Sequence, residues 1–155
     1  MIRPACRPGP RPGAVSVIKK PWGREILYAR HPRYAGKVIV VNGGHRLSLQ
    51  YHVEKHETIF VLDGRLVLRL GERSRVLKAG MAAAIPPRTV HRFEARFGRV
   101  TVLEASTPEL DDVVRLEDDY GRTSHSHPLQ EGTVPQGGTP TKPAPKRRRH
   151  SGRNA

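Results

Sequence analysis

This sequence has a single cysteine and no long apolar run. The chain of 155 residues contains one cysteine, Cys6, so it cannot form an internal disulfide, and it has no Cys-x-x-Cys pair for zinc. A reducing compartment is therefore expected, and we predict a cytoplasmic location. No stretch of about 18 apolar residues occurs, which excludes a transmembrane helix. Residues 1–13 contain no apolar segment of about 7–15 residues, so we expect no secretory signal there.

Acidic residues are also scarce, since 14 Asp and Glu stand against 28 Lys and Arg, a formal net charge of +14. Residues 1–20 carry five basic and no acidic residues, and residues 123–155 carry six basic and one acidic, a net +5 in each segment. The middle of the chain, 21–122, carries 17 basic and 13 acidic residues, a net +4. The basic run at 146–150 would contact nucleic acid nonspecifically through phosphates, but it has no interleaved aromatic residues for base stacking. The charge therefore does not indicate a core that binds nucleic acid.

Large apolar residues are rare at both ends of the chain. Residues 1–16 are rich in Arg, Pro and Gly, and residues 123–155 are rich in Ser, Thr, Pro, Gly, His and Arg. Neither segment can bury enough apolar surface to offset the entropy lost on ordering, so both are predicted to be disordered basic tails. Residues 17–122 remain as the folded unit, and their number is typical of a single domain.

Between the tails, short β-branched or alternating segments recur about every 8–12 residues, a pattern typical of all-β sandwiches and barrels. Asp63-Gly64 predicts a hairpin turn, and a short 3₁₀ or helical turn is expected near 108–112. No window of 12 residues has a helical period. We therefore predict an antiparallel β-barrel or jelly roll, with strands at 37–41, 47–52, 58–62, 66–70, 75–78, 83–85, 91–94 and 100–104.

Four polar side chains have the types and spacing of a metal site. Gln50 and His52 are two residues apart, so on a strand they point to the same face. Glu57 follows beyond a predicted turn, and His91 comes after a Pro-Pro pair. Two imidazoles, one carboxylate and one amide oxygen suit one divalent transition metal with open positions for substrate. The donor set is compatible with Zn, Mn, Co, Ni or Fe and does not select among them.

These residues resemble the two motifs of the cupin superfamily. The first motif is matched by Gly44, five residues, Gln50-x-His52, four residues, Glu57, six residues and Gly64, with Gln50 in place of the first motif histidine. The second motif is matched by Gly80, five residues, Pro86-x-Arg88, two residues and His91, with Arg88 in place of a glycine and Ala95 in place of an asparagine. The resemblance implies a cupin-type antiparallel jelly roll over the folded region.

Longer strings resemble the cupin domain of type II mannose-6-phosphate isomerases, which usually follows a mannose-1-phosphate guanylyltransferase domain. The strings are Lys20-Pro-Trp-Gly23, Gly44-His-Arg-Leu-Ser-Leu-Gln50, Ile85-Pro-Pro-Arg-Thr-Val-His91 and Val114-Arg-Leu-Glu-Asp-Asp-Tyr-Gly-Arg122. The metal ligands of phosphomannose isomerases are Gln, His, Glu and His, so the resemblance implies Gln50, His52, Glu57 and His91 as ligands. It also implies an isomerase that converts mannose 6-phosphate to fructose 6-phosphate. No Gly-rich nucleotide loop precedes the cupin motifs, so any guanylyltransferase is expected to be a separate partner. A homodimer of this chain is also expected.

The implied reaction needs cations for the substrate phosphate and a base for the C2 proton. Arg46, Arg115 and Arg122 are the catalytic-site candidates, because a guanidinium binds phosphate bidentately. Glu94, His56 and Lys55 are candidates for the base, and the sequence does not choose among them.

Two other functions remain open. The first is an oxygenase of the non-haem iron type, because His52, Glu57 and His91 alone form a two-His-one-carboxylate set. The second is a cupin that binds a sugar phosphate without turning it over.

Overall fold

The computed structural model describes residues 15–122, so the predicted tails lie outside the described residues except at their inner boundary, where a strand begins at Ser16. The described residues contain no helix, and hence none that could cross a membrane. The eleven strands are β1 (Ser16–Lys20), β2 (Gly23–His31), β3 (Tyr34–Val41), β4 (Leu49–Tyr51), β5 (Glu57–Asp63), β6 (Arg65–Leu70), β7 (Arg73–Lys78), β8 (Ala82–Ile85), β9 (His91–Glu94), β10 (Val100–Ser106) and β11 (Val114–Glu117).

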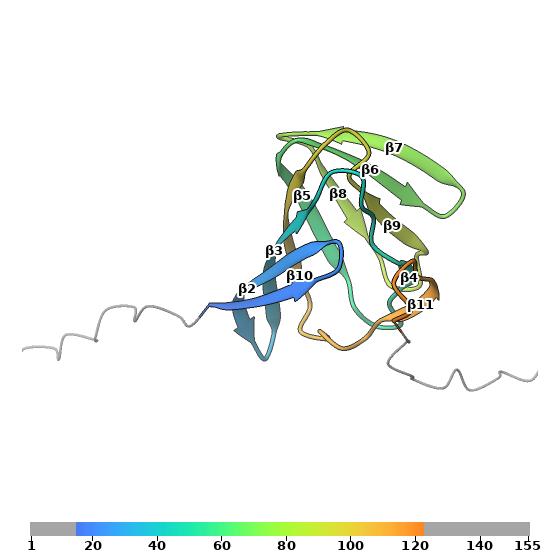
Figure 1. The fold of residues 1–155 in the computed structure, drawn as a ribbon. Helices are drawn as coiled ribbons and strands as arrows, with labels where there is room; N and C mark the ends of the chain where they lie inside the picture. Colours follow the sequence, from blue (N-terminus) through green and yellow to red (C-terminus); the bar gives the residue numbers. More distant parts are fainter. Residues whose placement is uncertain (1–14, 123–155) are drawn as a thin grey trace, which may run out of the picture.

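The strands form two antiparallel sheets that face each other (Figure 1). The six-stranded sheet has the order β1-β2-β3-β10-β5-β8, and the five-stranded sheet has the order β11-β4-β9-β6-β7. Inward-facing residues of the two sheets form one apolar core that includes Ile59, Leu68, Phe93 and Val102, and Trp22 from the turn between β1 and β2 joins it. This arrangement confirms the predicted all-β jelly roll.

The prediction of a hairpin at Asp63-Gly64 is wrong. The two flanking strands do not pair with each other, because β5 belongs to the six-stranded sheet and β6 to the five-stranded sheet. Gly64 has φ +83°, and a Cβ at this position would lie 2.5 Å from the backbone oxygen of Arg99. The glycine is therefore needed for a sharp corner between the sheets. A true hairpin follows between β6 and β7, where Arg65 pairs with Lys78 and Leu70 pairs with Arg73.

Three strands and one turn also differ from the prediction. Strands β1 and β2 form a hairpin at one edge of the six-stranded sheet, and β11 pairs with β4 at the edge of the other sheet. Their sequences, such as Val114–Glu117, have few β-branched residues or a weak alternation, so local pattern does not reveal them. Residues 108–112 contain a bend at Pro108 and a turn at Leu110 and Asp111, in place of the predicted 3₁₀ or helical turn.

Candidate metal centre

The two sheets bring the predicted metal-ligand residues to one place inside the fold. Gln50 lies in β4 and pairs across the strands with His91, the first residue of β9. His52 directly follows β4, and Glu57 is the first residue of β5 in the opposite sheet. The candidate centre therefore spans the space between the sheets, so neither sheet alone would form it.

His52, Glu57 and His91 form a compact cluster. One potential ligand atom from each residue lies within 4.8 Å of the others. The Nε2 atom of His52 is 3.6 Å from Oε2 of Glu57, and Nε2 of His91 is 3.3 Å from Oε1 of the same carboxylate. All three side chains are at most 3 % exposed. The cluster is therefore shielded from bulk water.

Both imidazoles are held by one ring nitrogen only. Nδ1 of His52 hydrogen-bonds to the backbone oxygen of Asp112, and Nδ1 of His91 hydrogen-bonds to the backbone oxygen of Thr89 at 2.9 Å. Since a carbonyl accepts, each Nδ1 carries the proton and each Nε2 carries a lone pair. Neither buried Nε2 atom has a hydrogen-bond partner among residues 15–122, the part of the chain that the structure describes. Burial, followed by the nearby charge of Lys55, lowers the pKa of His52 and favours the neutral ring. Protein metal centres hold ligating histidines in this way, so the residues fit a divalent cation.

Gln50 lies beside this cluster and lines the same cavity as His52 and Glu57. Its Oε1 atom accepts a hydrogen bond of 2.6 Å from the hydroxyl of Ser48. This bond fixes the orientation of the amide. The oxygen has a second lone pair, which remains available to a cation.

Lys55 forms a buried ion-pair triad with the candidate ligand Glu57. Its Nζ atom is 2.5 Å from Oε2 of Glu57 and 2.7 Å from Oε1 of Glu104. Burial opposes the charged form of Lys55, but the two carboxylates outweigh it and raise the pKa of the lysine. Burial likewise opposes the charged form of Glu104, and Lys55 outweighs it and lowers the pKa of that carboxyl. Lys55, one of the three candidates for the base, is therefore a protonated cation in this arrangement.

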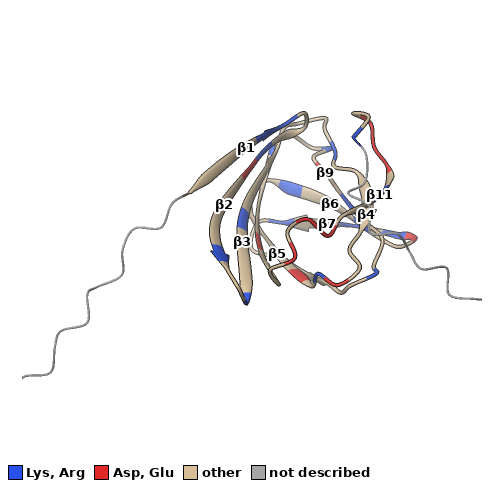
Figure 2. Ribbon diagram, turned by 90° about the horizontal axis from the view of Figure 1, so that it is seen from below, with Lys and Arg blue, Asp and Glu red and all other residues tan. Residues whose placement is uncertain are grey.

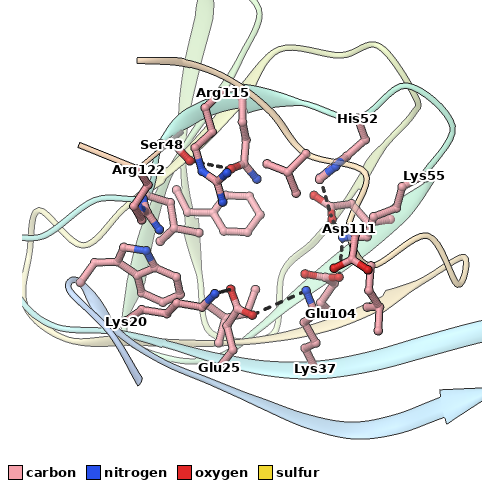
Figure 3. A pocket seen from close by; sticks show the side chains of 18 residues that line it. Lys20, Glu25, Lys37, Ser48, His52, Lys55, Glu104, Asp111, Arg115 and Arg122 are labelled. Carbon is pink, nitrogen blue, oxygen red and sulfur yellow. Dashed lines mark hydrogen bonds and ion pairs between the residues drawn. The ribbon is translucent and has the colours of Figure 1, made fainter. Parts of the chain in front are cut away.

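The cluster opens into a polar cavity of about 130 Å³ (Figure 3). Arg115 from β11 and Arg122 from the segment after it line this cavity. The Arg122 guanidinium also forms an ion pair with Asp118, whose own pKa it lowers against the effect of burial. Burial and then the charge of Arg122 lower the pKa of Arg115. Two of the three predicted phosphate-binding arginines therefore lie at the same cavity as the candidate metal ligands.

The third candidate for phosphate binding and the two other candidates for the base lie away from the cavity. Arg46 forms an ion pair with Asp119, with its Nε atom 2.6 Å from Oδ2, and it lines a separate depression on the outside of the five-stranded sheet. Glu94 lines that outer depression as well and forms an ion pair with Arg96 at 2.9 Å. His56 is exposed. Arg46, Glu94 and His56 therefore lie apart from the candidate metal cluster and from the cavity beside it.

Several cavity residues were missed by the sequence analysis. Glu25 of β2 lies 3.7 Å from both Lys20 and Lys37, and Figure 3 shows these side chains on the wall of the cavity. Glu104 of β10 and the indole of Trp22 also line it. Glu25 belongs to a strand that was not predicted, and its approach to Lys37 depends on the pairing of β2 with β3. Residues 23–31 have no apolar/polar alternation that could have signalled this placement.

Comparison with known protein families identifies the fold and the relatives of this chain. The family model described as "Cupin domain" matches residues 36–105. The alginate biosynthesis protein AlgA of Pseudomonas aeruginosa is 32 % identical over 112 residues, which are 69 % of this chain and 23 % of AlgA. The mannose-1-phosphate guanylyltransferase ManC of Salmonella typhimurium is 31 % identical over 109 residues, 68 % of this chain and 23 % of ManC. The chain thus spans less than a quarter of the length of these curated relatives.

Solved structures support the same conclusion for the fold. An RmlC-like cupin from Shewanella frigidimarina superposes with a TM-score of 0.57 at 14 % sequence identity, covering 63 % of this chain and 87 % of that protein. The chain therefore belongs to the cupin superfamily, and it is related to the cupin part of the type II mannose-6-phosphate isomerases.

Proposed function

We propose that this chain is a metal-dependent isomerase that interconverts mannose 6-phosphate and fructose 6-phosphate. The observation that carries the proposal is the buried cluster of His52, Glu57 and His91, in which both imidazole Nε2 atoms face the carboxylate without a hydrogen-bond partner. The similarity to AlgA and ManC adds support, because the first is named for alginate biosynthesis and the second is named as a mannose-1-phosphate guanylyltransferase.

The reaction transfers a proton between neighbouring carbons of the open-chain sugar. A base removes the proton from C2, the C2 hydroxyl proton moves to the C1 oxygen, and a proton returns to C1, so that the aldose becomes a ketose. The intermediate is an enediol, whose developing negative charge must be stabilised. A divalent cation held by Gln50, His52, Glu57 and His91 would supply this stabilisation as a Lewis acid.

Arg115 and Arg122 are the residues that we assign to the substrate phosphate. Both line the cavity, and the positive charge of Arg122 disfavours the charged form of Arg115. A phosphate dianion between them would relieve this repulsion and accept bidentate hydrogen bonds from the guanidinium groups.

Glu25 is the group that we assign as the base for the C2 proton. Its carboxylate lines the cavity and is 16 % exposed, whereas Glu57 and Glu104 are already held by Lys55 at short distance. Each carboxylate oxygen of Glu25 lies 3.7 Å from the ammonium of one lysine, Oε1 from Lys20 and Oε2 from Lys37, so neither oxygen accepts a hydrogen bond from its lysine.

Turnover of the purified full chain tests the proposed function. Samples loaded separately with zinc, manganese, cobalt, nickel or ferrous iron are incubated with mannose 6-phosphate, and fructose 6-phosphate is measured by NMR. We expect turnover with at least one metal, its loss with a chelator, and its loss in Arg115→Gln and Glu25→Gln. Oxygen consumption in place of isomerisation would favour the oxygenase alternative. Binding of the sugar phosphate without turnover would favour a non-catalytic cupin.

A further inference from the structure

A second basic site lies on the outer face of the five-stranded sheet, away from the cavity described above. It is a depression of about 180 Å³. Strands β6, β7 and β9, which carry blue basic segments in Figure 2, belong to the sheet that forms it. The residues that line it are Arg46, Arg69, Arg92, Arg96, Val67, Ser74 and Glu94.

The alternation of β9 separates this depression from the candidate metal centre. His91 and Phe93 point between the sheets, where they belong to the metal cluster and the apolar core. Arg92 lies between them in sequence, so its side chain points to the opposite face. The strand register then places Arg92 directly opposite Arg69 of β6. Two like charges at opposite positions of neighbouring strands destabilise a sheet, so an anion beside this pair would stabilise it.

The described carboxylates compensate these arginines only in part. Arg92 is 6 % exposed, and its Nη2 atom lies 3.1 Å from Oε2 of Glu117. Its buried Nε atom has no hydrogen-bond partner among the described residues. Arg69 donates from Nε to the backbone oxygen of Gly71 at 2.9 Å, and it has no ion pair among the residues that the structure describes. Arg92 therefore has an unused donor, and Arg69 has both donors and an unpaired charge, for a ligand.

We propose that this depression binds a small phosphate-type anion, either inorganic phosphate or the phosphate of a monoester. Converging guanidinium groups are the side chains best suited to tetrahedral oxyanions, because they donate in pairs and remain charged at all physiological pH values. Of the residues that the structure describes, no aromatic side chain lines the depression, so these residues offer no stacking surface of the kind that a nucleic-acid strand would use. The proposal is independent of the isomerase activity, since no lining residue belongs to the catalytic cavity.

Titration of the full chain with inorganic phosphate tests this proposal, with the NMR signals of the arginine Nε–Hε groups as the readout. We expect saturable shifts of the Arg69 and Arg92 signals. Arg69→Gln should weaken this binding about tenfold or more, because it removes charged hydrogen bonds. The matched control is Arg75→Gln, which makes the same charge change at an exposed position of β7 outside the depression and should leave the affinity nearly unchanged.

Thermal unfolding provides a second readout that does not depend on the arginine signals. Without phosphate, Arg69→Gln should unfold at the same temperature as the unaltered chain or higher, because the substitution relieves repulsion with Arg92. Phosphate should raise the midpoint of the unaltered chain and of Arg75→Gln more than that of Arg69→Gln.

Equal weakening by Arg69→Gln and Arg75→Gln would overturn the proposal, because it would indicate attraction by overall charge. Absence of saturable shifts at Arg69 and Arg92 would overturn it as well. A parallel titration with glycerol 3-phosphate identifies the source of the anion. Tighter binding of the ester would support a phosphomonoester as the ligand, and equal or weaker binding would support free phosphate.

Discussion

His52 and His91 each use one ring nitrogen for the fold and leave the other for a ligand. The carbonyls of Asp112 and Thr89 fix the tautomers, so the two Nε2 lone pairs converge on the carboxylate of Glu57. In an apolar interior two unsatisfied nitrogen atoms would be a net cost. Their presence at one point is explained if a cation completes the cluster.

His91→Ala should therefore abolish tight metal binding. We expect the affinity for zinc to fall at least about 100-fold, because loss of a ligand costs more than the 10–100-fold typical of losing a supporting hydrogen bond. Isothermal titration calorimetry of the metal-free chain measures this change. His56→Ala is the matched control, since His56 is exposed and lies outside the cluster. Equal affinity of the two variants for zinc would show that His91 is not a ligand.

Removal of the Lys55 ammonium should strongly destabilise the fold. Lys55→Met would leave the buried carboxylates of Glu57 and Glu104 without their shared cation. We expect the free energy of unfolding to fall by about 3–5 kcal/mol, the usual cost of breaking a buried ion pair from one side. Urea unfolding of the metal-free chain measures the change. The double variant Lys55→Met with Glu104→Gln should recover part of it, and full additivity of the two substitutions would contradict the triad.

At the scale of elements, the candidate metal centre depends on the segment that joins β4 to β5. Asp112, which lies 57 to 59 residues further along the sequence, fixes this segment. Its carboxylate accepts hydrogen bonds from the backbone N–H groups of Val53, Glu54 and Lys55. Its backbone oxygen also contacts His52. Burial opposes the charged form of Asp112, but these hydrogen bonds outweigh it and lower the pKa of the carboxyl below its ordinary 3.8.

Asp112→Asn should reduce the free energy of unfolding at pH 7 by about 1–3 kcal/mol, because an amide oxygen is a weaker acceptor for these three donors. The pKa of Asp112 is lower in the folded state than in the unfolded state. Its stabilisation is therefore complete above pH 3.8 and disappears as the pH falls through the folded-state value. Urea unfolding between pH 7 and pH 3 should show the two proteins converging at low pH. A difference that stays constant over this range would contradict the assignment.

The turn before β9 retains a backbone shape that suits glycine. Arg88 occupies the position at which the second cupin motif has glycine, and its φ is +62°. Its backbone N–H donates a 2.6 Å hydrogen bond to the oxygen of His52. The left-handed conformation of Arg88 is therefore stabilised by a hydrogen bond to His52, which is one of the candidate metal ligands.

Arg88→Gly should increase the free energy of unfolding by up to about 1 kcal/mol. The gain comes from the removal of left-handed strain, which exceeds the added entropy of glycine in the unfolded chain. Urea unfolding measures this change, and Lys78→Gly is a control in which glycine enters a strand and should destabilise the protein. A loss of stability in Arg88→Gly would contradict the argument from strain.

For the whole molecule, the sequence allowed the fold class and the spacing of the metal cluster to be predicted, because both depend on local patterns. Strand alternation and the positions of Gln50, His52, Glu57 and His91 can be read along the chain. The position of Glu25 on the wall of the cavity depends on the pairing of β2 with β3, which no local pattern reveals. Arg46 lies outside the cavity for a related reason, since its bridge to Glu94 of β9 places it on the outer face of a sheet.

The exchange of the C2 proton of mannose 6-phosphate with solvent is the most direct test of the central claim, that this cavity removes that proton with the help of a metal. The full chain is loaded with metal and incubated with the sugar phosphate in deuterated water, and deuterium at C2 is followed by NMR. We expect deuterium to appear with the metal-loaded chain and not with His91→Ala or with a chelator present. If the metal-loaded chain binds the sugar phosphate and C2 gains no deuterium, the isomerase account is wrong.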